Sequence, residues 1–302
     1  NNETKDVLSG ELALSCAYDQ YADAGNYPIV ASGLTSNNYK ITYVDGNLKV
    51  NPKEIGLEWS TNLEFTYDGE AHKPTATVTG LVNNDTCTVT VAGEKVNVGT
   101  HTATAEVLSN SNYKLPTEGL EKNYIINPKS ISGAIITLGE SLTYTGNELT
   151  QEVESVVLDG VTLVEGTDYE VSANKQTNAG TEYELIINGI GNYTGTLTKA
   201  FVVAKQKVDL PLANSNLVYT GTEIAGVASS SLYNVTSGTA VNAGTHTATV
   251  TLKDSSNYEW EEEFDGTVEY TISKAQLTII TSTSFINFIK FLIDFFIVYP
   301  SH

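Results

Sequence analysis

Cationic and sulfur-containing side chains are scarce in this chain of 302 residues. Sixteen Lys and Arg stand against 36 Asp and Glu, which gives a formal net charge of −20 and a pI near 4.4. Methionine is absent. Phosphate binding needs clustered cations, so this composition excludes nucleic acid as a partner. The acidity instead predicts a solvated surface whose self-repulsion favours an extended arrangement.

Helical patterning is also missing. No segment before residue 276 keeps apolar side chains at a helical period, so we expect almost no helix there. The chain does not begin with Met, and its first residues carry no signal-peptide pattern. We interpret it as a fragment of a longer protein whose export signal lies upstream.

What the chain does contain is an internal repeat with a period of about 75 residues. Each copy opens with Tyr-x-Gly, and the numbers of successive opening tyrosines differ by 144 − 67 = 77 and 219 − 144 = 75. An Asn-(Val/Ala)-Gly-Thr turn, an Asn-Tyr pair and a strand running into Lys follow in the same order each time. The openings are Tyr67, Tyr144 and Tyr219, and the closing lysines are Lys129, Lys205 and Lys274. This recurrence predicts an array of like modules.

The spacing from the turn glycine to the paired tyrosine is nearly constant. In three copies the residue numbers give 113 − 99 = 14, 193 − 180 = 13 and 258 − 244 = 14. A further pair with the same spacing, 39 − 25 = 14, indicates a copy that lacks its beginning. We therefore assign structural turn and corner roles to four glycines and four tyrosines: Gly25, Gly99, Gly180, Gly244, Tyr39, Tyr113, Tyr193 and Tyr258.

These signals divide the chain into five segments. We predict a partial module 1 at 1–52, module 2 at 53–128, module 3 at 129–205, module 4 at 206–275 and a hydrophobic tail at 276–302. Modules of this size are near the lower limit for folding on one core, so neighbours are expected to stabilise one another. Cys16 and Cys87 fall in different modules, which excludes a disulfide within a module. We expect both to be small buried strand residues.

Short segments rich in Thr and Val, bounded by Gly, Asn and Pro, predict strands. Alternation is clearest at 247–252, which we expect to be a half-buried antiparallel strand. In the Asn-Ala-Gly turns, Asn caps the turn through its side chain and Gly supplies a positive φ. Further predicted strands lie at 75–79, 86–91, 101–107, 124–126 and 196–203.

The order of signals within a module favours an all-β fold of small Ig-like sandwiches. Asp23-Ala-Gly-Asn-Tyr27 has the form that precedes strand F at a tyrosine corner. His101 and His246 replace this Tyr in two copies, and Tyr183 is displaced by one residue. We interpret both histidines as strand residues at the corner. A β-grasp-like or other compact β module is the alternative.

The tail breaks the repeat. Its apolar run at 285–299 is interrupted by Asn287, Lys290 and Asp294, and it is short for a spanning helix. Three interpretations stay open: an aberrant or truncated gene end, a membrane anchor, or a helix against the last module. Membrane contact is expected only in the second case.

Several segments resemble a known family. The stretch from Gly25 to Tyr39, running on to 44–50, resembles the MBG repeat (mostly beta, glycine-rich) of large bacterial surface proteins. The Tyr-Asp-Gly openings and the motifs at 166–169 and 189–195 resemble related tandem repeats of the same proteins. The resemblance covers 7–275. It implies an exported, extracellular, adhesin-like protein in which the repeats form a stalk, and it implies no catalytic residues.

The sequence predicts no catalytic, cofactor-binding or metal site. One His per module does not supply the converging ligands of a metal site. The glycine-rich segment 189–195 runs into a strand, whereas a phosphate loop needs a helix N-terminus. We predict a non-enzymatic protein without cofactors.

Two functions are kept open. The first is a structural spacer, in which case any host glycan or host protein is bound by a region outside this fragment. The second is a carbohydrate- or host-protein-binding β module whose ligand contacts are Trp59 and Trp260, since indole rings stack on sugars.

Overall fold

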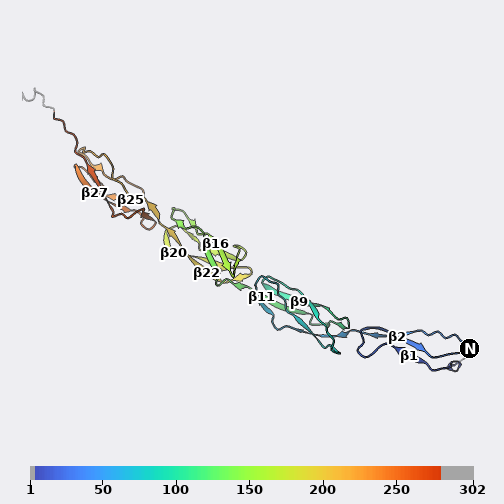
Figure 1. Cartoon of the computed structure of the whole chain (residues 1–302). Helices are drawn as coiled ribbons and strands as arrows, with labels where there is room; N and C mark the ends of the chain where they lie inside the picture. Colours follow the sequence, from blue (N-terminus) through green and yellow to red (C-terminus); the bar gives the residue numbers. More distant parts are fainter. Residues whose placement is uncertain (1–3, 280–302) are drawn as a thin grey trace, which may run out of the picture. The chain divides into compact units, whose positions relative to one another are not determined.

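Strands make up nearly all of the regular structure in the computed structural model, which describes residues 4–279 (Figure 1). The helical part of these residues is a single 3₁₀ turn, Lys5–Val7. The all-β fold class and the near absence of helix are thus confirmed. The tail lies outside the described residues from 280 onward.

The chain forms two compact units. The first comprises Asn1–Thr137, Val153–Ser172 and Ile186–Lys199, and the second comprises Leu138–Glu152, Ala173–Leu185 and Ala200–His302. The first unit therefore holds modules 1 and 2 and part of module 3. The second holds the rest of module 3 and module 4.

Module 2 shows how one module is built. A four-stranded sheet has the order β6-β11-β9-β8, with β6 parallel to β11 and the other pairs antiparallel. Figure 1 shows β9 and β11 side by side. β5 pairs with β7, and β4 lies parallel to β10. The strands are β4 Lys53–Glu54, β5 Gly56–Trp59, β6 Glu64–Thr66, β7 Ala76–Thr79, β8 Val89–Ala92, β9 Gly99–Leu108, β10 Tyr113–Lys114 and β11 Glu121–Asn127.

The order β8-β9-β11 corresponds to the C-F-G strands of an Ig-like sheet. Its inner face carries the core of the module, made by Val91, Ala103, Tyr124 and Ile126. These residues alternate with exposed ones along β9 and β11, because successive strand side chains point to opposite faces. Trp59 and Phe65 pack against the same cluster.

The same three-stranded arrangement recurs in modules 1 and 4. Module 1 has the order β1-β2-β3, and module 4 has the order β25-β27-β29, antiparallel throughout. In β27, Ala248 and Val250 are buried between exposed threonines, as the alternation at 247–252 predicts. The strands are β1 Ala13–Cys16, β2 Gly25–Ser32, β3 Gly46–Val50, β23 Gln206–Val208, β24 Ile224–Ala225, β25 Tyr233–Thr236, β26 Thr239–Ala240, β27 Gly244–Leu252, β28 Tyr258–Trp260 and β29 Thr267–Ile272.

Module 3 contributes to both units. In the first unit, β18 pairs with the second half of β20, and β12 lies parallel to β21. In the second unit, β14 lies parallel to the end of β22, and β15 pairs with β19. The strands are β12 Lys129–Ser130, β13 Ile135–Leu138, β14 Leu142–Thr143, β15 Leu149–Thr150, β16 Val153–Leu158, β17 Val161–Thr162, β18 Tyr169–Ser172, β19 Lys175–Gln176, β20 Gly180–Gly189, β21 Tyr193–Thr194 and β22 Thr196–Ala204.

Two local expectations are wrong. Cys16 is exposed, because every residue of the edge strand β1 is exposed, and Cys87 is half-buried just before β8. The strand predicted at 86–91 begins only at Val89. β-Branched composition marked these residues as strand, whereas the pairing with β9 starts at Val89 and Leu108.

Modules 2 and 4 differ in the hydrogen bonding of one buried tyrosine hydroxyl. Tyr124 in β11 is opposite His101, and Tyr270 in β29 is opposite His246, so the two tyrosines are equivalent. The Tyr124 hydroxyl lies 2.9 Å from the carbonyl oxygen of His72 and 2.8 Å from that of Gly93. The buried Tyr270 hydroxyl has no partner among the described residues.

This difference predicts opposite responses to the same substitution. Tyr124→Phe is expected to destabilise module 2 by about 1–2 kcal/mol, because buried carbonyls lose a donor. Tyr270→Phe is expected to leave module 4 unchanged or slightly more stable, because an unpaired buried hydroxyl is removed. Urea unfolding followed by fluorescence measures both, with Trp59 reporting module 2 and Trp260 module 4 after the other Trp is changed to Phe. Equal losses would contradict the prediction.

Candidate functional site

The turn before the central strand of each module is fixed by a ring-to-carbonyl hydrogen bond. The Tyr27 hydroxyl donates to the Asp23 carbonyl at 2.6 Å, and the Tyr183 hydroxyl donates to the Asn178 carbonyl at 3.1 Å. In the other two modules, Nε2 of histidine lies 2.8 Å from the carbonyl oxygen four positions earlier. These pairs are His101 with Asn97 and His246 with Asn242. The histidines thus take the place of the corner tyrosine.

The turn glycines differ in backbone conformation. Gly99 and Gly244 both have φ of +147°, which favours glycine, as the turn chemistry predicts. Gly180 does not have a positive φ, so the expectation for the Asn-Ala-Gly turns is wrong there, and Gly25 in the Asp-Ala-Gly turn does not have one either. Their modules use tyrosine at the corner. At Gly180 the ring of Tyr183 explains the glycine, because an added Cβ would lie 2.8 Å from it.

The groups that this turn presents are bound by the next module along the chain. In the first unit, Oδ1 of Asn112 in module 2 accepts a hydrogen bond from the backbone N–H of Ala24 in module 1 at 2.8 Å. Its Nδ2 donates to Oδ1 of Asp23 at 2.5 Å. One amide therefore pairs with both a side chain and a backbone group of the neighbouring turn. We call this pair of hydrogen bonds the amide clasp.

The amide clasp recurs at the other two junctions. Asn192 accepts from the Val98 N–H at 2.9 Å and donates to Oδ1 of Asn97 at 3.0 Å. In the second unit, Asn257 accepts from the Ala179 N–H at 2.8 Å and donates to Oδ1 of Asn178 at 3.2 Å. Each clasp joins the turn before the central strand of one module to the Asn-Tyr pair of the next.

The tyrosine of the Asn-Tyr pair supports the same junction. Tyr193 is 9% exposed, and its ring lies edge-to-face on Tyr67 with centroids 5.4 Å apart. Tyr144 and Tyr258 repeat this contact at 5.3 Å. Such contacts between opening and paired tyrosines contribute about 0.5–1.5 kcal/mol beyond the area they bury.

Two aspartate side chains stabilise loops through an ion pair and a hydrogen bond. The Asp159 carboxylate lies 2.8 Å from Nζ of Lys129 and raises the pKa of that ammonium group. At the third junction, Nδ2 of Asn257 also donates to Oδ2 of Asp254 at 2.8 Å, and this side-chain hydrogen bond lowers the pKa of Asp254. Asp254 therefore orients the amide that forms the clasp.

Comparison with known families decides what the first modules are. Residues 1–49 and 61–119 match the family model described as MBG domain (YGX type). These two segments are similar to MBG domains. Comparison with curated proteins finds no match to the chain. Modules 3 and 4 lie beyond the matched residues and carry the same corner and clasp groups as the two MBG modules.

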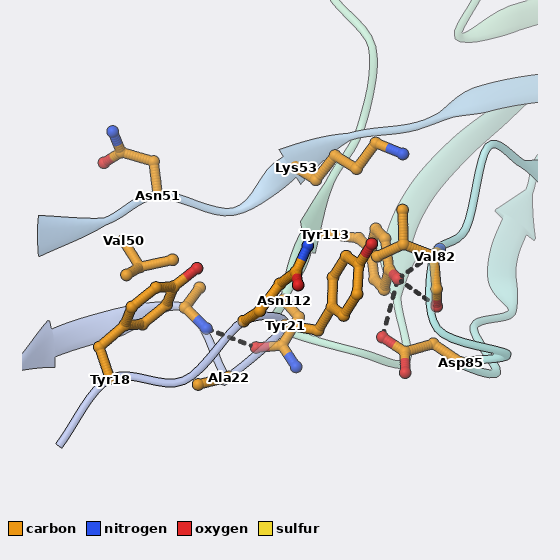
Figure 2. Close-up of a pocket in the computed structure, with 12 residues that line it drawn as sticks. Tyr18, Tyr21, Ala22, Val50, Asn51, Lys53, Val82, Asp85, Asn112 and Tyr113 are labelled. Atoms are coloured by element: carbon orange, nitrogen blue, oxygen red, sulfur yellow. Dashed lines mark hydrogen bonds between the residues drawn. The ribbon is translucent and has the colours of Figure 1, made fainter.

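A pocket of about 310 Å³ lies where the two MBG modules meet, and Figure 2 shows its lining. Tyr21 and Tyr113 both line it, and the Tyr113 hydroxyl donates to Oδ2 of Asp85 at 2.8 Å. At the second junction the corresponding space is about 90 Å³ and is lined by Tyr67 and Tyr193. Residues 1–52 contain no Tyr-x-Gly motif whose tyrosine could line the first space as Tyr67 lines the second.

Both tryptophans proposed as ligand contacts pack within their own modules. Trp59 is half-buried, and its Nε1–H donates to the Gly119 carbonyl at 3.0 Å. Trp260 is half-buried between Tyr233 and Phe264, with ring centroids 5.8 and 5.0 Å away. Their ligand role stays a prediction, and the two indoles belong to different units of the chain.

Residues 4–279 hold no group of three His, Cys, Asp or Glu side chains that could bind a metal ion. Nor does any helix in this range have the length and apolar character needed to cross a bilayer.

Sequence reasoning missed the clasp asparagines. The recurring Asn-Tyr pairs contain Asn112, Asn192 and Asn257, and their spacing predicts no contact outside their own module, whereas each binds the neighbouring module. A signal was present, because the Asn that opens each Asn-x-Gly turn precedes the Asn of the Asn-Tyr pair at a nearly constant spacing. The residue numbers give 112 − 97 = 15, 192 − 178 = 14 and 257 − 242 = 15. Three of the four predicted tyrosines, Tyr113, Tyr193 and Tyr258, directly follow these junction residues.

Proposed function

We propose that this chain is a non-enzymatic spacer of an exported, bacterial cell-surface, adhesin-like protein. The observation that carries the proposal is the amide clasp, which joins successive modules three times: an Asn amide accepts from a backbone N–H and donates to a side-chain oxygen of the neighbouring turn. MBG domains are β-rich repeat modules of surface proteins, which supports the same role. The spacer holds a binding region, outside this chain, away from the cell surface.

The physical argument is that each clasp restricts the angle between neighbours. A clasp supplies two hydrogen bonds, each contributing about 0.5–1.5 kcal/mol net. The tyrosine pair and the short linkers add to this restriction. The net charge of −20 opposes folding back of one module on another. Stiffness is what distinguishes a spacer from a flexible tether.

Small-angle scattering of the chain tests the spacer directly. A ten-residue strand such as β9 spans about 33 Å at 3.3 Å per residue, so modules 2 to 4 end to end extend over roughly 100 Å. We expect a scattering profile of an elongated particle at least this long. A compact globule would refute the spacer.

Breaking one clasp is expected to loosen one junction without unfolding either module. Asn192→Ala removes both hydrogen bonds of the second junction. Spin labels at the exposed positions Thr90 and Thr162, with both native cysteines replaced by serine, report the distance between modules 2 and 3. We expect the distance distribution to broaden while Trp59 fluorescence stays unchanged.

The matched control is Asn123→Ala. The Asn123 amide accepts a hydrogen bond from Thr102 within module 2, so its loss leaves the junction intact. The distance distribution of this variant is expected to equal that of the parent chain. Equal distributions for parent and Asn192→Ala would show that the clasp does not set the angle between the modules.

A further inference from the structure

In module 2 an early strand of the chain lies directly beside the last one. β6 and β11 are parallel, and three residues of each strand are opposite one another. The hydrogen bonds continue at both ends of this contact. The Ile125 N–H donates to the Leu63 carbonyl at 2.8 Å, and the Tyr67 N–H donates to the Asn127 carbonyl at 2.9 Å. We call this parallel contact, between the strand at the Tyr-x-Gly opening and the last strand, the terminal strand pair.

The terminal strand pair recurs in the next two modules. In module 3, β14 lies parallel to the end of β22, and the Tyr144 N–H donates to the Ala204 carbonyl at 2.9 Å. In module 4, Val218 and Ser273 form a parallel bridge, and the Tyr219 N–H donates to the Ser273 carbonyl at 2.9 Å. The opening tyrosine of each repeat thus donates to the end of the last strand of its own module.

The covalent path of the chain runs through these pairs. Only Pro128 separates β11 of module 2 from β12 of module 3, and only Lys205 separates β22 from β23 of module 4. Tension along the chain therefore pulls the opening strand of a module toward the preceding module and the last strand toward the following one. Because the two strands are parallel, these opposed forces slide one strand along the other.

The strand by which the chain enters each module is held in the same direction. β4, β12 and β23 lie parallel to β10, β21 and β28, respectively. In module 2, opposed residues Lys114 and Glu54 form an ion pair across this contact at 2.7 Å. In module 4, Lys207 and Glu259 do the same at 2.8 Å. Tension meets a sliding contact at the entry of a module as well as at its terminal strand pair.

The direction of the load decides how hydrogen bonds resist it. Sliding stretches all the hydrogen bonds of a pair together, whereas a force across the strands opens them one after another. Each bond contributes about 0.5–1.5 kcal/mol net, so simultaneous loading raises the barrier to unfolding. Sliding in module 2 also separates Phe65 from Tyr124, whose rings lie edge-to-face with centroids 5.9 Å apart. Forced unfolding is governed by this barrier.

We propose that modules 2 to 4 bear tensile load along the chain, and that the terminal strand pair is the element that resists it. The inference rests on the proposed spacer role and adds that the spacer works under tension. The opening tyrosine then has a mechanical role through its backbone N–H, in addition to the contact that its ring makes at a junction.

Single-molecule pulling of the full chain in two directions tests the proposal. Both native cysteines are replaced by serine, and handles are attached through new cysteines at exposed positions. Handles at 51 and 127 load module 2 along its strands, and handles at 106 and 121 load β9 and β11 across theirs. At a fixed force, we expect unfolding to be at least about tenfold slower in the first geometry, because several hydrogen bonds must break together.

Two variants at one position test the strand pair itself. Tyr67→Pro removes the N–H that donates to Asn127, whereas Tyr67→Ala removes the same ring and keeps the N–H. In the first geometry we expect Tyr67→Pro to unfold about two- to tenfold faster than Tyr67→Ala, and the variants should differ less in the second. Trp59 fluorescence checks that both are folded before the pull.

The outcomes separate this proposal from the spacer role. Equal unfolding rates of the parent chain in the two geometries, or of the two variants in the first geometry, would overturn the load-bearing role. A chain that is elongated in scattering and gives either result keeps the spacer role and loses only the tension. A compact particle in scattering refutes the spacer, whatever the pulling experiment gives.

Discussion

Replacing Gly226 with alanine is expected to destabilise module 4 by about 3 kcal/mol. An added Cβ would lie 2.1–2.3 Å from atoms of the Tyr270 ring, which is 2% exposed in the core of the module. The backbone cannot easily move away. The Gly226 N–H donates to the Gly238 carbonyl, and its own carbonyl accepts from the Asn214 N–H, both at 2.7 Å.

The measurement is urea unfolding of module 4 by Trp260 fluorescence in a Trp59→Phe background. A double-mutant cycle with Tyr270→Leu supplies the control, since a smaller side chain leaves room for the added methyl group. We expect the cost of Gly226→Ala to fall markedly in that background, because contacting residues are not additive. An equal cost in both backgrounds would mean that the tyrosine ring is not the obstacle.

Ile55→Ala is expected to destabilise module 2 by about 2–4 kcal/mol, whereas Leu277→Ala should change module 4 by less than about 0.5 kcal/mol. Both residues follow a core strand by five positions. Ile55 is 4% exposed, so truncation leaves a cavity; Leu277 is 79% exposed and leaves none. Trp59 and Trp260 fluorescence report the two modules separately.

Leu277→Ala serves as the control in this comparison. A large loss for this variant would show that the Leu277 side chain is covered, which would contradict its 79% exposure. A small loss for Ile55→Ala would show that this position is not part of the module's core.

Composition and spacing were sufficient for the fold class. The predicted strands are rich in Thr and Val and are separated by Gly and Asn, so no segment before residue 276 has the apolar period of a helix. The alternation around Ala248 and Val250 predicts which face of their strand is buried. The corner role of His101 also follows from its place after the turn. The side-chain period of a strand is two, so burial along it can be read locally.

Two glycines show what the local sequence pattern does not predict. Gly226 belongs to no repeated signal, and its need for a missing side chain comes from the Tyr270 ring, which lies on a strand much later in the chain. Gly25 belongs to the repeated signal, yet its φ is not positive, and nothing lies within 4 Å of an added Cβ. Recurrence identified a turn but did not determine the backbone angle of its glycine, which differs between copies.

The sequence by itself determined that this chain is an all-β array with a recurring order of turns, tyrosines and asparagines. Only the tertiary structure decided what the asparagines bind. An amide can cap its own turn or pair elsewhere, because its donor and acceptor fit either partner equally well. The groups joined by the clasps are 88, 94 and 78 residues apart in sequence, so their pairing follows from how the modules meet.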